Sequence, residues 1–168
     1  MSEATAAAID RSKLGRASRR KGHDAERAVA RWLRDNGWPG AERAVRTGYA
    51  GTTRSIADPG DITGTPGIVW QVKDCTREQI TAWLDETEEQ RAAARADYGF
   101  LIVRRRGTAD VGRWRVWLDV DQLMQLAGVS TTWCGNNTTI GEETVRLELH
   151  VVARWLLVRG YGGEAVAS

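Results

Sequence analysis

Cysteine and histidine are scarce in this 168-residue sequence, which contains two of each. Two cysteines give no disulfide framework, and neither pairs with a histidine at the spacing of zinc ligands, so we expect reduced thiols and no zinc site. Long apolar runs are also missing, because the longest, such as residues 100–103, are far too short to span a bilayer. The N-terminus opens polar, without the apolar core of a secretory signal, so the expected location is the cytoplasm.

The composition is that of a soluble globular protein, with 42% hydrophobic and 27% charged residues. A chain of this length has room for a single buried core and some tails. We therefore expect a basic flexible arm over residues 1–20, disordered or loosely helical, and one core domain over residues 21–126. Residues 127–168 are expected to extend the same domain and to end in a loose tail.

The net charge of +2 conceals an uneven distribution of charge. Residues 11–34 contain nine lysines and arginines against two acidic residues, and Arg104–Arg106 with Arg113 and Arg115 form a second basic cluster. Residues 74–97, between these two segments, are acidic. Segregated positive charge attracts a polyanion such as nucleic acid. A solvated, arginine-rich surface without a partner is the alternative interpretation.

Hydrophobic periodicity and turn residues predict a helix, three strands, a helix and two strands, in that order. The first helix is expected to begin near residues 22–24, with Asp24 as a possible N-cap, and to end at residues 36–37. The expected strands are 44–47, 61–63, 68–73, 98–103 and 114–118, the expected helices are 78–96 and a short one capped by Asp119 or Asp121, and one or two further strands are expected within 144–158. This order predicts an α/β sandwich with a mixed sheet.

In the clearest of these strands, Gln71 and Lys73 project to one side, whereas Trp70 and Val72 project to the other. A lysine in the middle of an otherwise apolar strand is costly unless it meets a partner. Asp61 begins the preceding expected strand, ten residues upstream of Gln71. If those two strands pair as a hairpin, Asp61 reaches the same end of the sheet as Gln71 and Lys73.

This arrangement is suited to the hydrolysis of phosphodiester bonds. Carboxylate and amide oxygens are hard ligands for Mg²⁺, with Mn²⁺ as a substitute, and the metal also bridges to phosphate. Lys73 can orient the attacking water or screen the phosphate as a compact point charge. Two alternatives remain at this point: Asp58 in place of Asp61 as the metal ligand, and an ordinary Asp–Lys pair on a half-exposed strand.

The segment Asp58-Pro-Gly-Asp61 followed by Gln71-Val-Lys73 resembles the core motif of the PD-(D/E)XK nuclease superfamily. Residues 21–27 and the helix after them are similar to the first helix of archaeal-type Holliday junction resolvases within that superfamily. The resemblance covers roughly residues 20–118 and implies a restriction-endonuclease-like α/β sandwich. It also implies a metal-dependent catalytic site made up of Glu26, Asp61, Gln71 and Lys73. The metal ligands of this site would be Glu26, Asp61 and Gln71.

The resemblance further implies that the glycine-rich loop before Asp61 contacts DNA. With the basic residues that precede the first helix, the expected DNA-binding residues are Arg19, Arg20, Lys21, Arg46, Thr53, Arg54 and Ser55. By analogy we expect a homodimer that acts on branched or duplex DNA, with no membrane and no small-molecule cofactor. The expected setting is genome maintenance (recombination and repair) in the nucleoid of a bacterial or phage-infected cell.

Gln71 is the one departure from the motif, because the resembled enzymes carry an acid there. Restriction-type branches resembling Mrr use Gln-X-Lys, so the departure is compatible with activity. The sequence therefore predicts a structure-selective DNA endonuclease, a Holliday junction resolvase. The alternatives are a restriction-like or exonucleolytic DNase, a nuclease of RNA, and a DNA-binding module that has the nuclease fold without catalysis.

Overall fold

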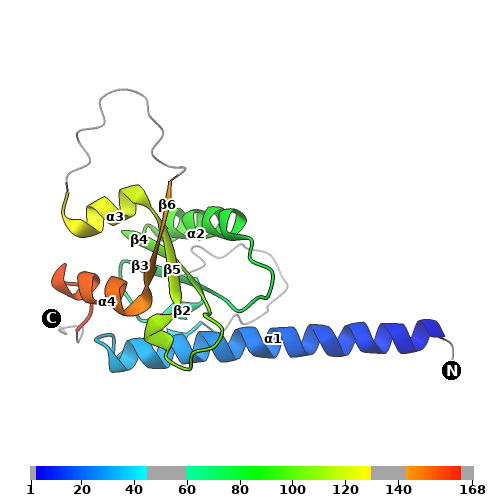
Figure 1. Ribbon diagram of the computed structural model, residues 1–168. Helices are drawn as coiled ribbons and strands as arrows, with labels where there is room; N and C mark the ends of the chain where they lie inside the picture. The colour runs from blue at the N-terminus through cyan, green and yellow to red at the C-terminus, as the bar shows by residue number, and fades with distance from the viewer. Residues whose placement is uncertain (1–2, 45–59, 130–142, 164–168) are drawn as a thin grey trace.

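The computed structural model describes residues 3–44, 60–129 and 143–163, with side chains from Arg19 onward. Figure 1 shows the sheet between α2 on one side and α1 on the other. The elements follow one another in the order α1 (Glu3–Asp35), β1 (Glu42–Arg43), β2 (Ile62–Thr63), β3 (Ile68–Lys73), α2 (Ile80–Ala94), β4 (Tyr98–Val103), the 3-10 turn η1 (Val111–Arg113), β5 (Arg115–Asp119), α3 (Val120–Ala127), β6 (Thr144–Glu148) and α4 (Leu149–Val158).

Four strands form the central sheet in the order β3-β4-β5-β6. β3 and β4 are parallel, which requires the crossover that α2 supplies, whereas β4 with β5 and β5 with β6 are antiparallel. The predicted α/β class with a mixed sheet flanked by helices is therefore confirmed. The short strands β1 and β2 pair with each other in a separate antiparallel sheet.

β4 is buried on both faces and divides the core into two parts. Phe100 and Ile102 belong to the main hydrophobic cluster, which contains residues of α1 and α4. Leu101 and Val103 belong to a smaller cluster together with Trp83 of α2. A strand that is covered on both faces has a nearly continuous apolar sequence. The bounds predicted for β3 and β4 are confirmed by the structure.

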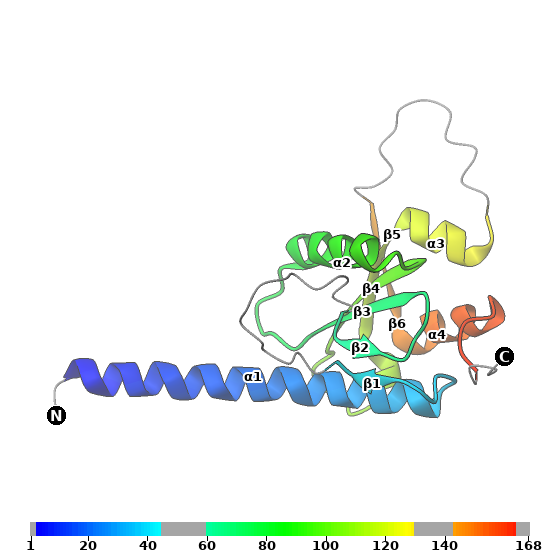
Figure 2. The same cartoon turned by 180° about the vertical axis from the view of Figure 1, so that it is seen from behind.

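α1 is much longer than the sequence predicted. It runs without a break for 33 residues, about 50 Å at 1.5 Å per residue, and Figures 1 and 2 show its N-terminal half extending beyond the sheet. The predicted start near residues 22–24 is wrong, and Asp24 is no N-cap but an interior residue paired with Arg27. Residues 3–21 contain five alanines, many lysines and arginines, and no proline, so intrinsic helix propensity continues the helix without an apolar stripe.

The prediction of strands within residues 144–158 is half right. β6 accounts for residues 144–148, but the apolar segment that follows is the helix α4. Its buried residues recur at the three- and four-residue spacing of a helix, and they are Leu149, Val152, Ala153 and Leu156. The alternation of apolar residues from Val145 onward continues by coincidence into the first turn of this helix, which is why strand and helix were confused.

The expected hairpin of β2 with β3 does not form, because β2 pairs with β1 instead. This pairing depends on a close approach of two backbones at Gly64, where an added Cβ would lie 1.8 Å from the carbonyl oxygen of Gly40. The strand predicted at residues 44–47 lies mostly outside the described residues, and the observed strand is β1.

The other predicted elements are present with small shifts. α2 and β5 lie within one or two residues of the predicted bounds, and Asp119 caps α3 by accepting a hydrogen bond from the Gln122 backbone N–H. Residues Gly160–Gly163 were expected to be loose, yet the Tyr161 hydroxyl donates to Asp97 at 2.7 Å and the Gly163 N–H donates to the Gly37 carbonyl. Within the described part of the chain, none of the helices is sufficiently long and apolar to traverse a bilayer.

Candidate functional site

The four residues predicted to be catalytic line a single cavity of about 470 Å³. They come from three separate parts of the chain: Glu26 from α1, Asp61 from the turn before β2, and Gln71 and Lys73 from β3. The far wall of the cavity belongs to α2, which contributes Glu86, Glu89 and Gln90. The structure thus brings together side chains that lie up to 64 residues apart in the sequence, from Glu26 to Gln90.

Asp61 lies beside β3 although β2 does not pair with it. The backbone N–H of Asp61 donates to the Trp70 carbonyl at 2.8 Å, and the Val72 N–H donates to the Asp61 carboxylate at 2.8 Å. Gly60 makes this possible, because it has a φ of +81° and an added Cβ would lie 2.6 Å from the Trp70 carbonyl oxygen. The glycine of the Asp58-Pro-Gly-Asp61 segment therefore allows the aspartate to reach the edge of β3.

Gln71 and Lys73 project from the same face of β3, as the alternation predicted. Trp70 and Val72, on the opposite face, belong to the main hydrophobic cluster. Gln71 is 3% exposed, and both ends of its amide are hydrogen-bonded: Nε2 donates to Glu86 at 2.9 Å, and Oε1 lies 2.8 Å from the Thr87 hydroxyl. The burial of this polar side chain is compensated by these two contacts.

Lys73 has the partner that its position in an apolar strand requires. Its Nζ donates to the Glu86 carboxylate at 2.9 Å and lies 5.6 Å from the centroid of the Trp83 ring. The same carboxylate oxygen, Oε2, accepts from both Lys73 and Gln71. The hydrogen bond from Lys73 lowers the pKa of Glu86, with a smaller contribution from Gln71, while partial burial opposes the shift.

Glu86 is not among the residues that the sequence predicted for this site. Trp83 and Thr87 are the buried residues of α2, and Glu86 precedes Thr87 by one position and follows Trp83 by three. Residues three apart lie on neighbouring positions of a helix surface, so Glu86 was recognisable as an acid at the margin of the buried face. Nothing in the sequence indicated which strand that margin would meet.

Glu26 lines the cavity, but its carboxylate is already paired. The Arg43 Nε of β1 donates to Glu26 Oε2 at 2.6 Å, and both side chains are largely buried. Arg43 was also not anticipated by the sequence analysis, since a two-residue strand leaves no periodic signal. This pair anchors β1 to α1 next to the cavity.

Carboxylate oxygens are the groups through which this cavity could hold a metal ion. Within the part of the chain that the structure describes, no three His, Cys, Asp or Glu side chains form a group that could hold a metal ion. Mg²⁺ usually takes only one or two protein carboxylates and keeps several waters or substrate phosphate oxygens. The cavity offers hard carboxylate oxygens and neither histidine nor cysteine, a donor set suited to Mg²⁺ or Mn²⁺ and not to zinc.

The predicted DNA-binding residues are only partly described. Arg19, Arg20 and Lys21 are exposed on α1. The remaining predicted contacts and the alternative metal ligand lie outside the described residues, and they are Arg46, Thr53, Arg54, Ser55 and Asp58.

The second basic cluster of the sequence is largely paired with acids. Arg104 and Arg106 both contact Asp74, whose side chain is fully buried, at 2.8 and 2.7 Å. The other arginines of the cluster also have carboxylate partners: Arg105 and Arg113 contact Glu148, and Arg115 contacts Glu78. These ion pairs reduce the positive potential that the sequence alone suggested for this segment.

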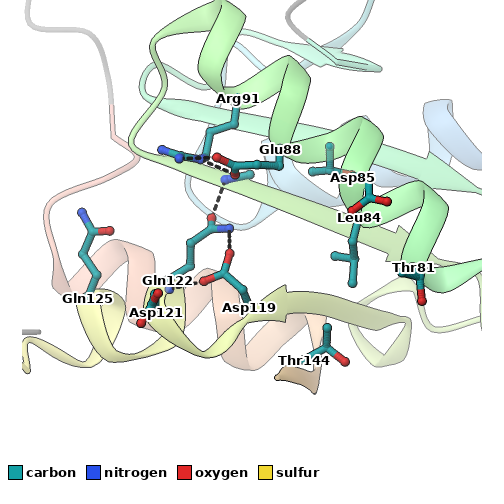
Figure 3. A pocket seen from close by; sticks show the side chains of 12 residues that line it. Thr81, Leu84, Asp85, Glu88, Arg91, Asp119, Asp121, Gln122, Gln125 and Thr144 are labelled. Atoms are coloured by element: carbon teal, nitrogen blue, oxygen red, sulfur yellow. Dashed lines mark hydrogen bonds and ion pairs between the residues drawn. The ribbon is translucent and has the colours of Figure 1, made fainter. Parts of the chain in front are cut away.

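A second cavity, of about 780 Å³, lies on the other side of α2, between α2 and α3 (Figure 3). It is lined by the carboxylates of Asp85, Glu88, Asp119 and Asp121. Figure 3 shows its interior contacts, in which Gln122 donates to Asp119 and accepts from the backbone of β4. Arg91 pairs with Glu88, and this hydrogen bond raises the pKa of the guanidinium. No lysine is among the described residues that line this cavity.

Comparison of the chain with protein-family models, with curated proteins and with solved structures gave no match.

Proposed function

We propose that this chain is a Mg²⁺-dependent DNA endonuclease that acts on four-way or branched DNA. The observation that supports this proposal is the shared cavity of Glu26, Asp61, Gln71 and Lys73. The set combines carboxylates with a lysine, which is the chemistry needed to hold a divalent cation next to a phosphate. The exposed basic residues Arg19, Arg20 and Lys21 of α1 would contact the DNA backbone.

In the proposed reaction, a water oxygen bonds to phosphorus, the bond from phosphorus to one sugar oxygen breaks, and that oxygen takes up a proton. A bound Mg²⁺ would supply Lewis-acid stabilisation of the charge that develops on the phosphate. Asp61 is held for this task by the Val72 N–H, so its carboxylate needs little reorganisation. Lys73 adds a compact positive charge at the same place.

A homodimer belongs to the same proposal. Two copies related by a two-fold axis would present two cavities to the symmetric strands of a four-way junction. The restriction-like or exonucleolytic alternative would cut linear duplex as well as it cuts junctions.

The test is Mg²⁺-dependent cleavage of a synthetic four-way junction and of a linear duplex with the same sequence. We expect wild-type protein to cut the junction preferentially and Lys73→Ala to bind the DNA without cutting it. Equal cutting of both substrates would refute the junction preference and leave a general DNase. Cleavage of RNA in preference to DNA would refute the DNA assignment.

A second candidate is a DNA-binding module with no catalysis, and the ion pair of Glu26 with Arg43 favours it. This pair at 2.6 Å occupies the carboxylate that the first helix would offer to a metal. Binding of junction DNA by wild type and by Lys73→Ala, with no cleavage by either protein in Mg²⁺ or Mn²⁺, would select this candidate.

A further inference from the structure

The proposed site is one negative charge short of the motif that it resembles. Gln71 is neutral where the motif carries an acid, and the Glu26 carboxylate is neutralised by its ion pair with Arg43. The charges of Asp61 and Lys73 then sum to zero. A site without net negative charge attracts a divalent cation weakly, since cation affinity depends on the number of charged ligands. A further ionised carboxylate would therefore strengthen the binding of Mg²⁺ in this cavity.

The hydrogen bonds of the Gln71 amide point to Glu86 as the source of that carboxylate. Glu86 in its ionised form can only accept hydrogen bonds, so the amide nitrogen of Gln71 has to face it, and Nε2 does so at 2.9 Å. The amide oxygen consequently faces the buried Thr87 hydroxyl, at 2.8 Å. The polar atom that Gln71 directs at Glu86 is thus a donor, and a donor cannot bind a cation.

We propose that Glu86, on α2, supplies the carboxylate that β3 lacks and holds the divalent cation together with Asp61. Gln71 is then a positioning residue, because it holds Glu86 through Nε2 and is itself held by Thr87. With Glu86 included, two carboxylates and one lysine restore the net charge of −1. This inference rests on the proposed function, since it concerns the metal of the same site.

The other acids of the cavity are less suited to this role. Glu26 is paired with Arg43 at 2.6 Å, and only 16% of its side-chain surface is exposed. Glu89 lines the cavity, but among the described residues the structure shows no hydrogen bond between it and either Gln71 or Lys73. Glu86 is also accessible to a cation from solvent, because half of its side-chain surface is exposed.

The experiment exchanges the carboxylate and the amide between the two positions. Binding of Mn²⁺ to the full-length, metal-free protein is measured through the electron paramagnetic resonance signal of free Mn²⁺. Four proteins are compared: wild type, Glu86→Gln, the double variant Gln71→Glu with Glu86→Gln, and Asp85→Asn. Asp85→Asn is the matched control, because it removes one charge from the adjacent residue of α2, which lines the other cavity. Circular dichroism confirms that each variant is folded.

We expect Glu86→Gln to weaken Mn²⁺ binding by about tenfold or more, since a charged ligand is lost. The double variant should regain most of the affinity, because it moves the carboxylate to the strand and keeps an amide opposite it. Asp85→Asn should bind as wild type does. Unchanged Mn²⁺ affinity in Glu86→Gln, or absence of Mn²⁺ binding by wild type, would overturn the inference.

Cleavage assays on the same four proteins separate this inference from the proposed function. If wild type and Glu86→Gln cut junction DNA equally well and bind Mn²⁺ equally tightly, the inference fails and the nuclease proposal stands. If wild type binds Mn²⁺ through Glu86 and cuts no nucleic acid, the inference stands and the nuclease proposal fails.

Discussion

Two buried glutamines lie on opposite sides of α2, and their surroundings differ in one respect. Gln71 donates from its amide nitrogen to Glu86, and Gln122 donates in the same way to Asp119. Both side chains are less than a tenth exposed. Only the Glu86 carboxylate also accepts from a lysine, whereas Asp119 accepts from the backbone N–H of Gln122 and caps α3.

The difference distinguishes a candidate site from a structural contact. A buried amide–carboxylate pair and additional acidic residues occur on both sides of α2. Neither feature by itself therefore indicates a functional site. The Gln71 side, which comprises Glu26, Asp61, Gln71, Lys73 and Glu86, also contains a strand lysine. On the Gln122 side, the carboxylate is used to begin a helix and to hold that helix against β4. Substitutions matched across the two sides can test this distinction.

The largest expected effect is on cleavage. Asp61→Asn should reduce the rate of Mg²⁺-dependent junction cleavage by about a hundredfold or more, because it removes the proposed metal ligand, which Val72 holds in place. Asp121→Asn removes one carboxylate from the Gln122 side and should leave the rate within about twofold, since solvated charges away from a site contribute little. Initial rates on a labelled four-way junction measure both. Similar losses of cleavage rate in the two variants would show that the two sides of α2 do not differ in function.

The next effect is on stability and concerns the glycine that places Asp61. Gly60→Ala should lower the free energy of unfolding by about 2–4 kcal/mol, because it combines a positive φ with a clash against the Trp70 carbonyl. Gly107→Ala is the control, since Gly107 has a φ of +80° with no atom within 4 Å of an added Cβ. Its expected loss is only about 1 kcal/mol, from strain alone. Urea unfolding measures both, and equal losses would show that the approach of Gly60 to β3 is unimportant.

A smaller effect separates the two glutamines directly. Gln71→Glu and Gln122→Glu each place a second carboxylate against the first, which should destabilise the metal-free protein by about 1–3 kcal/mol at neutral pH. Millimolar Mg²⁺ should restore stability to Gln71→Glu, because that cavity would then hold a cation between carboxylates, and should not restore it to Gln122→Glu. Thermal unfolding with and without Mg²⁺ provides the measurement. Equal rescue of both variants would contradict a specific site on the Gln71 side.

The smallest expected effect is a pH dependence that arises from Glu86. Its pKa is lowered by the hydrogen bond from Lys73, so the ionised carboxylate stabilises the fold above its ordinary pKa of 4.5. This contribution is lost as the pH falls below 4.5 and through the lowered pKa of the folded protein. Glu86→Gln should therefore lose less stability than wild type between pH 6 and pH 3, by a small margin because Glu86 is half exposed. Urea unfolding of both proteins between pH 6 and pH 3 provides the measurement. The same loss of stability in wild type and in Glu86→Gln would rule out this coupling.

Local rules predicted the parts of the fold that depend on periodicity and burial. β4 was predictable because a strand covered on both faces has a nearly continuous apolar sequence. β3 was predictable because Ile68, Trp70 and Val72 alternate with Gln71 and Lys73 on the other face. The end of α1 was predictable from Asn36-Gly37, and the start of α3 to within two residues, from Asp119 or Asp121. The start of α1 was missed because its N-terminal half has helix propensity but no apolar stripe. α4 was missed because its first residues continue the alternation of β6.

The candidate site, like the fold, was predictable from the sequence only in part. The sequence by itself determined that Gln71 and Lys73 share a face, because side chains alternate along any strand. Only the tertiary structure decided that Glu86 and Arg43 would meet the predicted residues, and that Asp61 would reach β3 through Gly60 and not through a hairpin. The reason is that long-range contacts depend on how the α2 crossover packs on β3 and β4, and no local pattern encodes that register.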